Sequence, residues 1–141
     1  MRRIYWDTML YAYWLEANNK LSRRVHHIYQ TMSQRSDTLC SSLFVLGELL
    51  VGPVKTNDSD AASSIQQFFD SPAVLMLPYA APSVRLFAEL RANHGVKALD
   101  ALHLSIAATS GVDLFLTHDR RLHRLAVSGL PFIAGLETDL F

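Results

Sequence analysis

The sequence has little of several residue types, and each shortage excludes a class of protein. Its one cysteine, Cys40, cannot form an internal disulfide bond, which fits a reducing compartment. Charged residues make up only 18% of the chain and apolar residues 50%, a composition that excludes intrinsic disorder. Polar residues interrupt every apolar run before it reaches the ~20 residues of a membrane-spanning helix. We therefore expect a soluble globular protein with Cys40 in its core.

The chain also lacks an excess of charge, because thirteen acidic residues balance thirteen basic ones. This neutral total counts against a nucleic-acid-binding protein of the strongly basic kind. If several acids hold cations, however, the bound ions cancel that acidic charge and leave a net basic surface. The start, Met1-Arg2-Arg3, is followed by Asp7 rather than by a long apolar stretch. We therefore expect no signal peptide, a cytoplasmic location and no membrane association.

Apolar periodicity and turn residues predict strands that alternate with helices. The strands are expected at 2–6, 37–41, 73–77 and 113–117. The helices are expected at 9–17, 21–34, 43–51, 57–69, 82–93, 99–110 and 120–127. Ser41 or Ser42 is expected to cap the third helix, and Gly52-Pro53 to end it. Because helical crossovers join parallel strands, we predict a single α/β domain spanning residues 1–141, a three-layer α/β/α fold with a central, mostly parallel sheet.

Four acidic residues stand in apolar surroundings, unlike the other acids of the chain. Asp7 directly follows the apolar strand Ile4-Tyr5-Trp6, and Asp119 follows the last predicted strand. Glu48 lies in a helix that is apolar on nearly every face, and Asp100 lies in the first turn of another apolar helix. A carboxylate away from water needs a partner for its charge. In open parallel sheets, ligands bind at the carboxyl ends of the strands, which is where Asp7 and Asp119 are expected.

Convergence of these carboxylates would require a cation. Each pair at ~4 Å repels by about 4 kcal/mol at an effective dielectric constant of ~20, a large fraction of the stability of a small domain. Oxygen ligands favour Mg²⁺ or Mn²⁺ over Zn²⁺, and two such ions activate a water and stabilise the leaving oxygen in phosphodiester hydrolysis. Taken singly, each acid is more often a helix cap or an ion-pair partner, so the spacing alone leaves that alternative open.

Four segments, in a fixed order, resemble the PIN-domain family, in particular the VapC-like toxins of bacterial toxin–antitoxin pairs. They are Ile4-Tyr5-Trp6-Asp7-Thr8, Glu48-Leu49-Leu50-Val51-Gly52, Leu99-Asp100-Ala101-Leu102-His103-Leu104 and Phe115-Leu116-Thr117-His118-Asp119-Arg120-Arg121-Leu122. The resemblance covers almost the whole chain. Two positions depart from it, since many members have Asn or Ser where Met9 stands and Asn where His118 stands.

The resemblance implies a metal-dependent endoribonuclease, the toxin of a toxin–antitoxin pair. Its implied metal ligands and catalytic residues are Asp7, Glu48, Asp100 and Asp119, with Mg²⁺ as cofactor and Mn²⁺ as a possible substitute. Its implied partners are an RNA substrate and a cognate antitoxin. The hydroxyl groups of Thr8 and Thr117 are expected to orient ligands or substrate beside the acids.

Basic residues after the last predicted strand are candidates for contact with RNA. Arg120 and Arg121 could position an RNA backbone near the acids, although a solvated helix face explains them equally well. His118, beside Asp119, could reach the metal or the phosphate, with a structural role as the alternative. His103, three residues after Asp100, is expected to be a core histidine rather than a catalytic one.

Aromatic residues crowd the first strand and helix beyond what one core face requires. They are Tyr5, Trp6, Tyr11, Tyr13 and Trp14. Some of them are therefore expected to line a protein interface, either of a homodimer or of a groove that holds an antitoxin segment.

Two other functions fit the same residues. The first is a catalytically silent PIN-fold module that binds RNA or regulates another protein. The second is a phosphatase that uses Asp7 as its nucleophile, which Met9 disfavours because a second Asp is expected at that position.

Overall fold

The computed structural model describes residues 1–15 and 19–141. Its strands are β1 (Arg3–Trp6), β2 (Thr38–Ser41), β3 (Leu75–Met76), β4 (Leu114–Leu116) and β5 (Phe132–Ala134). Its helices are α1 (Thr8–Leu15), α2 (Lys20–Arg35), α3 (Leu43–Lys55), α4 (Ser59–Asp70), α5 (Ala81–His94) and α6 (Ala98–Thr109), with a short 3-10 turn η1 (Leu122–Arg124). Residues 16 and 17, which belong to the first predicted helix, lie outside the described residues.

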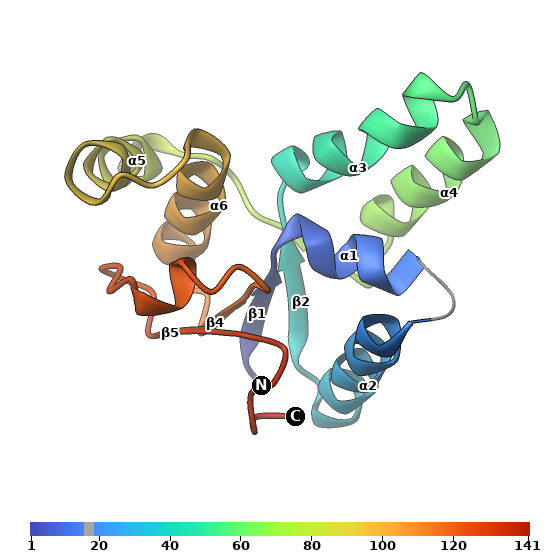
Figure 1. Cartoon of the computed structure of the whole chain (residues 1–141), viewed down its shortest axis with the longest axis horizontal. Helices are drawn as coiled ribbons and strands as arrows, with labels where there is room; N and C mark the ends of the chain where they lie inside the picture. The colour runs from blue at the N-terminus through green and yellow to red at the C-terminus, as the bar shows by residue number, and fades with distance from the viewer. Residues whose placement is uncertain (16–18) are drawn as a thin grey trace.

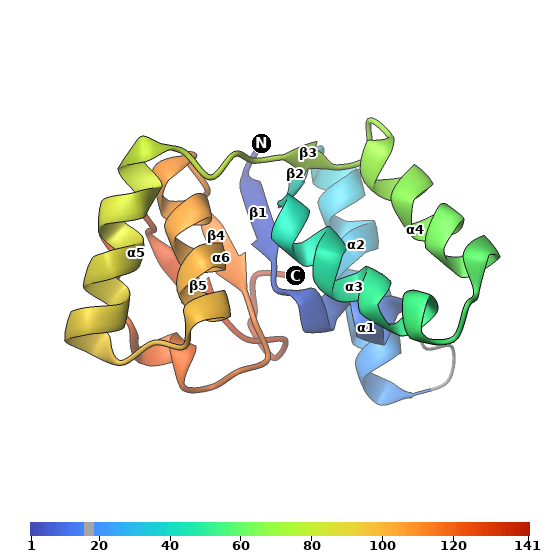
Figure 2. The ribbon, with the colours of Figure 1, turned by 90° about the horizontal axis from the view of Figure 1, so that it is seen from above.

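The five strands form one sheet in the order β3-β2-β1-β4-β5, and every neighbouring pair is parallel. β1 lies at the centre of this order, with β2 on one side and β4 on the other. α3 and α4 lie over the half of the sheet near β2 and β3, whereas α5 and α6 lie over the half near β4 and β5 (Figures 1 and 2). The predicted α/β architecture with a parallel sheet is confirmed.

β1 shows why both faces of the sheet must be covered. Successive side chains of a strand point to opposite faces. The indole of Trp6 packs against aromatic rings of α1 and α2, including Tyr11 at 5.2 Å and Tyr29 at 6.1 Å between ring centroids. Tyr5 faces the other way, stacked on Phe115 of β4 at 5.2 Å and 5.9 Å from the His103 ring of α6. One strand therefore contributes to two cores.

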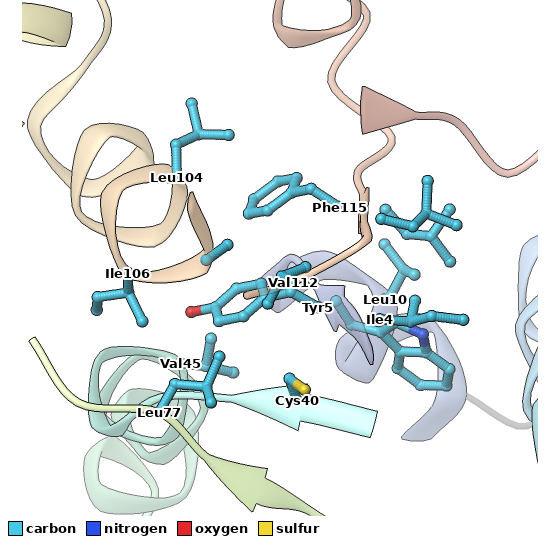
Figure 3. Close-up of a cluster of buried hydrophobic side chains, with 14 of the residues drawn as sticks. Ile4, Tyr5, Leu10, Cys40, Val45, Leu77, Leu104, Ile106, Val112 and Phe115 are labelled. Atoms are coloured by element: carbon cyan, nitrogen blue, oxygen red, sulfur yellow. The ribbon is translucent and has the colours of Figure 1, made fainter. Parts of the chain in front are cut away.

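The two cores explain most of the aromatic crowding in the first helix and strand. Tyr5 and Trp6 are fully buried and Tyr11 is 2% exposed, so none of the three can line an external interface. Figure 3 shows the ring of Tyr5 among the apolar side chains of Val45, Ile106 and Phe115. The expectation that some of these aromatics face a partner therefore narrows to Tyr13 and Trp14.

Two helix predictions were wrong in extent. Gly52-Pro53 does not end the third helix, which continues to Lys55 as α3. Pro53 removes only one helical hydrogen bond, and regular bonding continues after it, since Thr56 N donates to Gly52 O at 3.1 Å. The predicted helix 120–127 is only the turn η1, because an extended Leu125 ends it.

The third and fifth strands also differ from expectation. Only Leu75 and Met76 of the predicted strand 73–77 pair with β2. β5 was not predicted, yet its backbone pairs with all three residues of β4. Within residues 1–15 and 19–141, no helix has the length and apolarity needed to cross a membrane.

Gly129 provides a test of this fold, because it turns the chain towards β5 close to α6. Its φ is +86°, and a Cβ there would lie 2.6 Å from the Ala108 carbonyl oxygen. We expect Gly129→Ala to lower the free energy of unfolding by ~1–3 kcal/mol through backbone strain and this clash. Gly47, inside α3, has open space around it, so Gly47→Ala is expected to raise that free energy by ~0.5–1 kcal/mol. Urea unfolding followed by circular dichroism measures both; equal effects would contradict this account of Gly129.

Candidate active site

The carboxyl ends of β1 and β4 bring two of the four acids to one edge of the sheet. Asp7 follows β1 directly, and its backbone N–H donates to Leu116 O of β4 at 2.9 Å. Asp119 follows β4 after Thr117 and His118. Because the two strands are neighbours with parallel direction, their C-terminal residues cannot separate.

Asp7 is held by hydrogen bonds to both of its carboxylate oxygens. Oδ1 accepts from the backbone N–H of Thr8 at 2.8 Å, and Oδ2 accepts from the hydroxyl of Thr117 at 2.8 Å. Thr117 is fully buried, and its Oγ1 also accepts from the backbone N–H of Asp119 at 3.1 Å. Thr117 therefore fixes the two acids relative to each other.

Glu48 reaches the same region from α3. Its Oε1 accepts two hydrogen bonds at 2.6 Å, one from the Thr8 hydroxyl at the start of α1 and one shared with Nε2 of His103 on α6. Burial raises the pKa of Glu48, but the hydrogen bonds from His103 and Thr8 outweigh it and bring that pKa below its usual value. The carboxylate is therefore stabilised in its charged form.

Asp100 carries the clearest sign that the acids lie close together. It lies in the first turn of α6, as predicted, and is partly buried. Burial raises its pKa, and the negative charges of Asp7 and Asp119 raise it further, against the opposing effects of His103 and Arg121. This electrostatic coupling places three of the four predicted acids in one neighbourhood.

Asp119 is paired with a cation of the chain itself. The Arg121 guanidinium donates to both oxygens of Asp119, Nε to Oδ1 at 3.0 Å and Nη2 to Oδ2 at 2.8 Å. These hydrogen bonds are the main cause that lowers the pKa of Asp119. Arg121 thus neutralises the Asp119 carboxylate in this conformation.

The donor set suits a hard divalent cation. All four acids offer carboxylate oxygens, the ligands that hard divalent cations prefer. Among residues 1–15 and 19–141, however, no three acidic, histidine or cysteine side chains stand close enough to share one ion in the present arrangement. Binding by Asp119 would therefore require its carboxylate to leave Arg121.

The remaining predicted residues fall into two groups. Arg120 and Arg121 are exposed beside the acids, where they can meet a phosphate. His118 is half-buried, and its ring meets the Tyr13 ring edge-on at 5.8 Å, so it has a packing partner as well as its place beside Asp119.

Sequence reasoning missed a set of hydrogen bonds behind Glu48. His103 is buried, as expected for a core histidine, but it bonds to Glu48 rather than serving only the core. Its Nδ1 lies 2.8 Å from the Tyr5 hydroxyl, which in turn lies 2.8 Å from Oγ of Ser42. Ser42 occupies the N-cap position of α3, yet its side chain makes no cap hydrogen bond. The available signal was the polar tip of Tyr5 in an otherwise apolar strand, since a buried phenol needs a partner.

Comparisons with known proteins agree with this architecture. A family model described as the PIN domain matches residues 4–128. Similar solved structures include VapBC2 from Rickettsia felis bound to a DNA fragment from its promoter, with TM-score 0.74 and 19% identity over 94% of this chain and 98% of that chain. DNA-bound VapBC from Salmonella typhimurium gives 0.69 and 18% over 96% and 99%, and a toxin–antitoxin complex from Klebsiella pneumoniae gives 0.69 and 14% over 93% and 99%. No curated protein matches the chain significantly.

The repulsion at Asp100 makes a prediction about the metal-free protein. In EDTA at pH 7, Asp100→Asn is expected to raise the thermal midpoint by a few degrees, because ~1 kcal/mol corresponds to roughly 4 °C in a domain of this size. Solvent screening keeps the gain small, since Asp100 is only partly buried. A raised pKa means that the charged form is the destabilising one, so the gain must shrink as the pH falls through the pKa of Asp100.

Calorimetry at several pH values measures this effect. Asp60→Asn, an exposed acid in the first turn of α4, is the matched control and is expected to give no gain. A midpoint for Asp100→Asn that is unchanged or lower at pH 7 would contradict the proximity of the acids.

Proposed function

Because the chain belongs to the PIN-domain family, we propose that it is an endoribonuclease that cleaves RNA phosphodiester bonds with Mg²⁺ or Mn²⁺. PIN domains are generally nucleases that use divalent metal ions. The observation that carries the proposal is the meeting of carboxylates at the carboxyl edge of the sheet, where Thr117 hydrogen-bonds to Asp7 and Asp119 and Thr8 hydrogen-bonds to Asp7 and Glu48. Such a cluster of carboxylates lowers the stability of a fold unless the carboxylates bind a cation.

In this proposal Asp7, Glu48, Asp100 and Asp119 hold the metal. Divalent ions in such a site activate a water and stabilise the leaving oxygen of a phosphodiester. Thr117 orients Asp7 through Oδ2, and Thr8 orients Asp7 and Glu48 together, through its backbone N–H and its hydroxyl. These fixed hydrogen bonds keep the acids in place before the substrate arrives.

The exposed guanidinium groups of Arg120 and Arg121 supply the contacts with the RNA backbone. Guanidinium groups bind phosphate oxygens through paired hydrogen bonds, and such contacts position a nucleic acid without reading its sequence. Arg121 differs from Arg120 in that two N–H groups of its guanidinium already donate to the carboxylate of Asp119. When Asp119 binds the metal, the released guanidinium is free for a phosphate beside it.

The first experiment measures cleavage of a mixed pool of structured RNAs by the purified chain with Mg²⁺, Mn²⁺ or EDTA. We expect cutting with either metal and none in EDTA. Asp7→Asn and Asp100→Asn are each expected to lower the rate at least ~100-fold, since each removes a proposed ligand. Asp60→Asn serves as the exposed control and is expected to cut like the wild type.

The same experiment separates the proposal from a catalytically silent RNA-binding module. RNA that is bound but uncut under every metal condition supports the silent module. Cutting that persists in EDTA or in both site variants would overturn the metal-dependent assignment.

An apolar groove of about 600 Å³ offers a place for the antitoxin. It lies between α1, α3 and α4, and its lining includes Trp14, Leu15, Leu49, Ile65 and Phe68. The matched structures are VapBC and toxin–antitoxin complexes, which supports a toxin role for this chain and an antitoxin as its partner. We propose that an amphipathic antitoxin segment lays its apolar face in this groove. The predicted homodimer stays a prediction.

Expression in a bacterial host tests the toxin role. Wild-type chain is expected to arrest growth and Asp7→Asn is not, because only the former retains the proposed ligand set. Co-expression of a cognate antitoxin is expected to restore growth. Ile65→Arg should arrest growth but resist that rescue, since a charge in the groove repels an apolar segment.

Val84→Arg is the matched control, because Val84 is an exposed apolar residue of α5 outside the groove. It should arrest growth and be rescued like the wild type. Rescue of Ile65→Arg to the wild-type level would show that the antitoxin binds elsewhere.

A further inference from the structure

A chain of hydrogen bonds runs through the core behind Glu48. It begins at Oγ of Ser42 and passes to the Tyr5 hydroxyl at 2.8 Å. The Tyr5 hydroxyl also lies 2.8 Å from Nδ1 of His103. The other ring nitrogen of His103, Nε2, bonds to Oε1 of Glu48 at 2.6 Å, where the series ends. Three elements contribute, since Tyr5 lies on β1, His103 on α6 and both Ser42 and Glu48 at or in α3.

Three of the four residues that these hydrogen bonds connect are shielded from water. Ser42 and His103 are each 1% exposed and Tyr5 is fully buried. A buried polar group without a partner destabilises the fold, so the hydrogen bonds define one orientation of the imidazole. Only Glu48, whose side chain is 30% exposed, connects this buried chain to the acidic site.

The two hydrogen bonds on Glu48 converge on one oxygen. Oε1 lies 2.6 Å from both the Thr8 hydroxyl and Nε2 of His103. Within residues 1–15 and 19–141, no hydrogen bond is found to Oε2. Two donors on one oxygen fix the plane of the carboxylate and leave the other oxygen for a ligand outside the chain.

We propose that His103 is a positioning residue, held by Tyr5 and Ser42, that orients the Glu48 carboxylate so that Oε2 is available to the metal ion. This inference rests on the proposed function, because it takes Glu48 as a metal ligand. His103 itself touches neither metal nor substrate. It holds a metal-binding carboxylate in place through a hydrogen bond. Loss of such a supporting residue typically lowers metal affinity or activity ~10–100-fold.

Two substitutions of His103 distinguish its two hydrogen bonds. In His103→Gln, the amide nitrogen lies as many bonds from the backbone as Nε2 and keeps a donor for Glu48. In His103→Asn, the amide group matches the position of Nδ1, so a partner for Tyr5 remains but the donor to Glu48 is lost. Both variants remove the ring and keep a polar amide; they differ by one methylene group, so the thermal melts report the packing loss of each separately.

The measurement is Mn²⁺ binding to the full chain by isothermal titration calorimetry, with thermal melts to verify folding. We expect His103→Asn to weaken Mn²⁺ binding ~10–100-fold and His103→Gln to stay within about threefold of the wild type. Tyr5→Phe removes a single hydroxyl, so it should fold and weaken binding by several-fold. Tyr11→Phe, which alters another buried tyrosine outside this chain of hydrogen bonds, should bind Mn²⁺ like the wild type.

Cleavage kinetics give a second readout. The Mn²⁺ concentration at half-maximal rate should rise in His103→Asn and Tyr5→Phe, whereas kcat at saturating Mn²⁺ should change much less. A purely structural defect would instead lower the folded fraction and leave the metal dependence of the remaining activity unchanged.

The possible outcomes separate this inference from the proposed function. If the wild type binds Mn²⁺ and cuts RNA while His103→Asn and Tyr5→Phe bind Mn²⁺ normally, the positioning role is overturned and the nuclease stands. Weaker Mn²⁺ binding in those variants supports the positioning role even where the wild type cuts no RNA. A wild type that binds no Mn²⁺ overturns both.

Discussion

The central position of β1 is the constraint on which the site depends. Hydrogen-bonded neighbours occupy both of its edges and apolar side chains cover both of its faces, so Ile4, Tyr5 and Trp6 are fully buried. The first residue after these three that can present a charge is therefore Asp7, where the strand ends. β4 ends beside it in parallel register, with Trp6 opposite Leu116, so the loop carrying Asp119 starts at the same edge. The pairing that stabilises the core also brings the acids together.

Assembling like charges at that edge opposes folding. Hydrogen-bond donors from several elements offset part of this repulsion. Two carboxylates at ~4 Å repel by about 4 kcal/mol at an effective dielectric constant of ~20. The Thr117 hydroxyl, the Thr8 hydroxyl and backbone N–H, the His103 imidazole and the Arg121 guanidinium all point to carboxylate oxygens. Asp100 has no such partner among the described hydrogen bonds, and burial, together with the charges of Asp7 and Asp119, raises its pKa.

Local sequence was sufficient to predict some features but not those set by tertiary contacts. The parallel sheet could be predicted because helices alternate with strands. The four acids were singled out because each interrupts an apolar segment and because the segments around them resemble the PIN-domain family; their role as metal ligands stays a prediction. The bond between His103 and Glu48 joins residues 55 apart, so no local pattern signals it. β5 pairs only through three residues of β4, and α3 continues past Pro53 because the proline removes a single hydrogen bond of the helix. The aromatics of the first strand were misjudged because one core face was assumed where the sheet has two.

The acidic site and the apolar groove are built from the same two helices. α1 begins with Thr8 beside the acids and ends with Trp14 and Leu15 in the groove, and α3 carries Glu48 next to Leu49, which lines the groove. The hydrogen bond between Thr8 and Glu48 joins these helices at the acidic end. Side chains of α4, in contrast, line the groove and make none of the hydrogen bonds described for the four acids. A change at a partly exposed groove residue of α4, such as Ile65, therefore alters the groove without removing a hydrogen bond of the acids, whereas changes on α1 or α3 can alter the support of the acids as well.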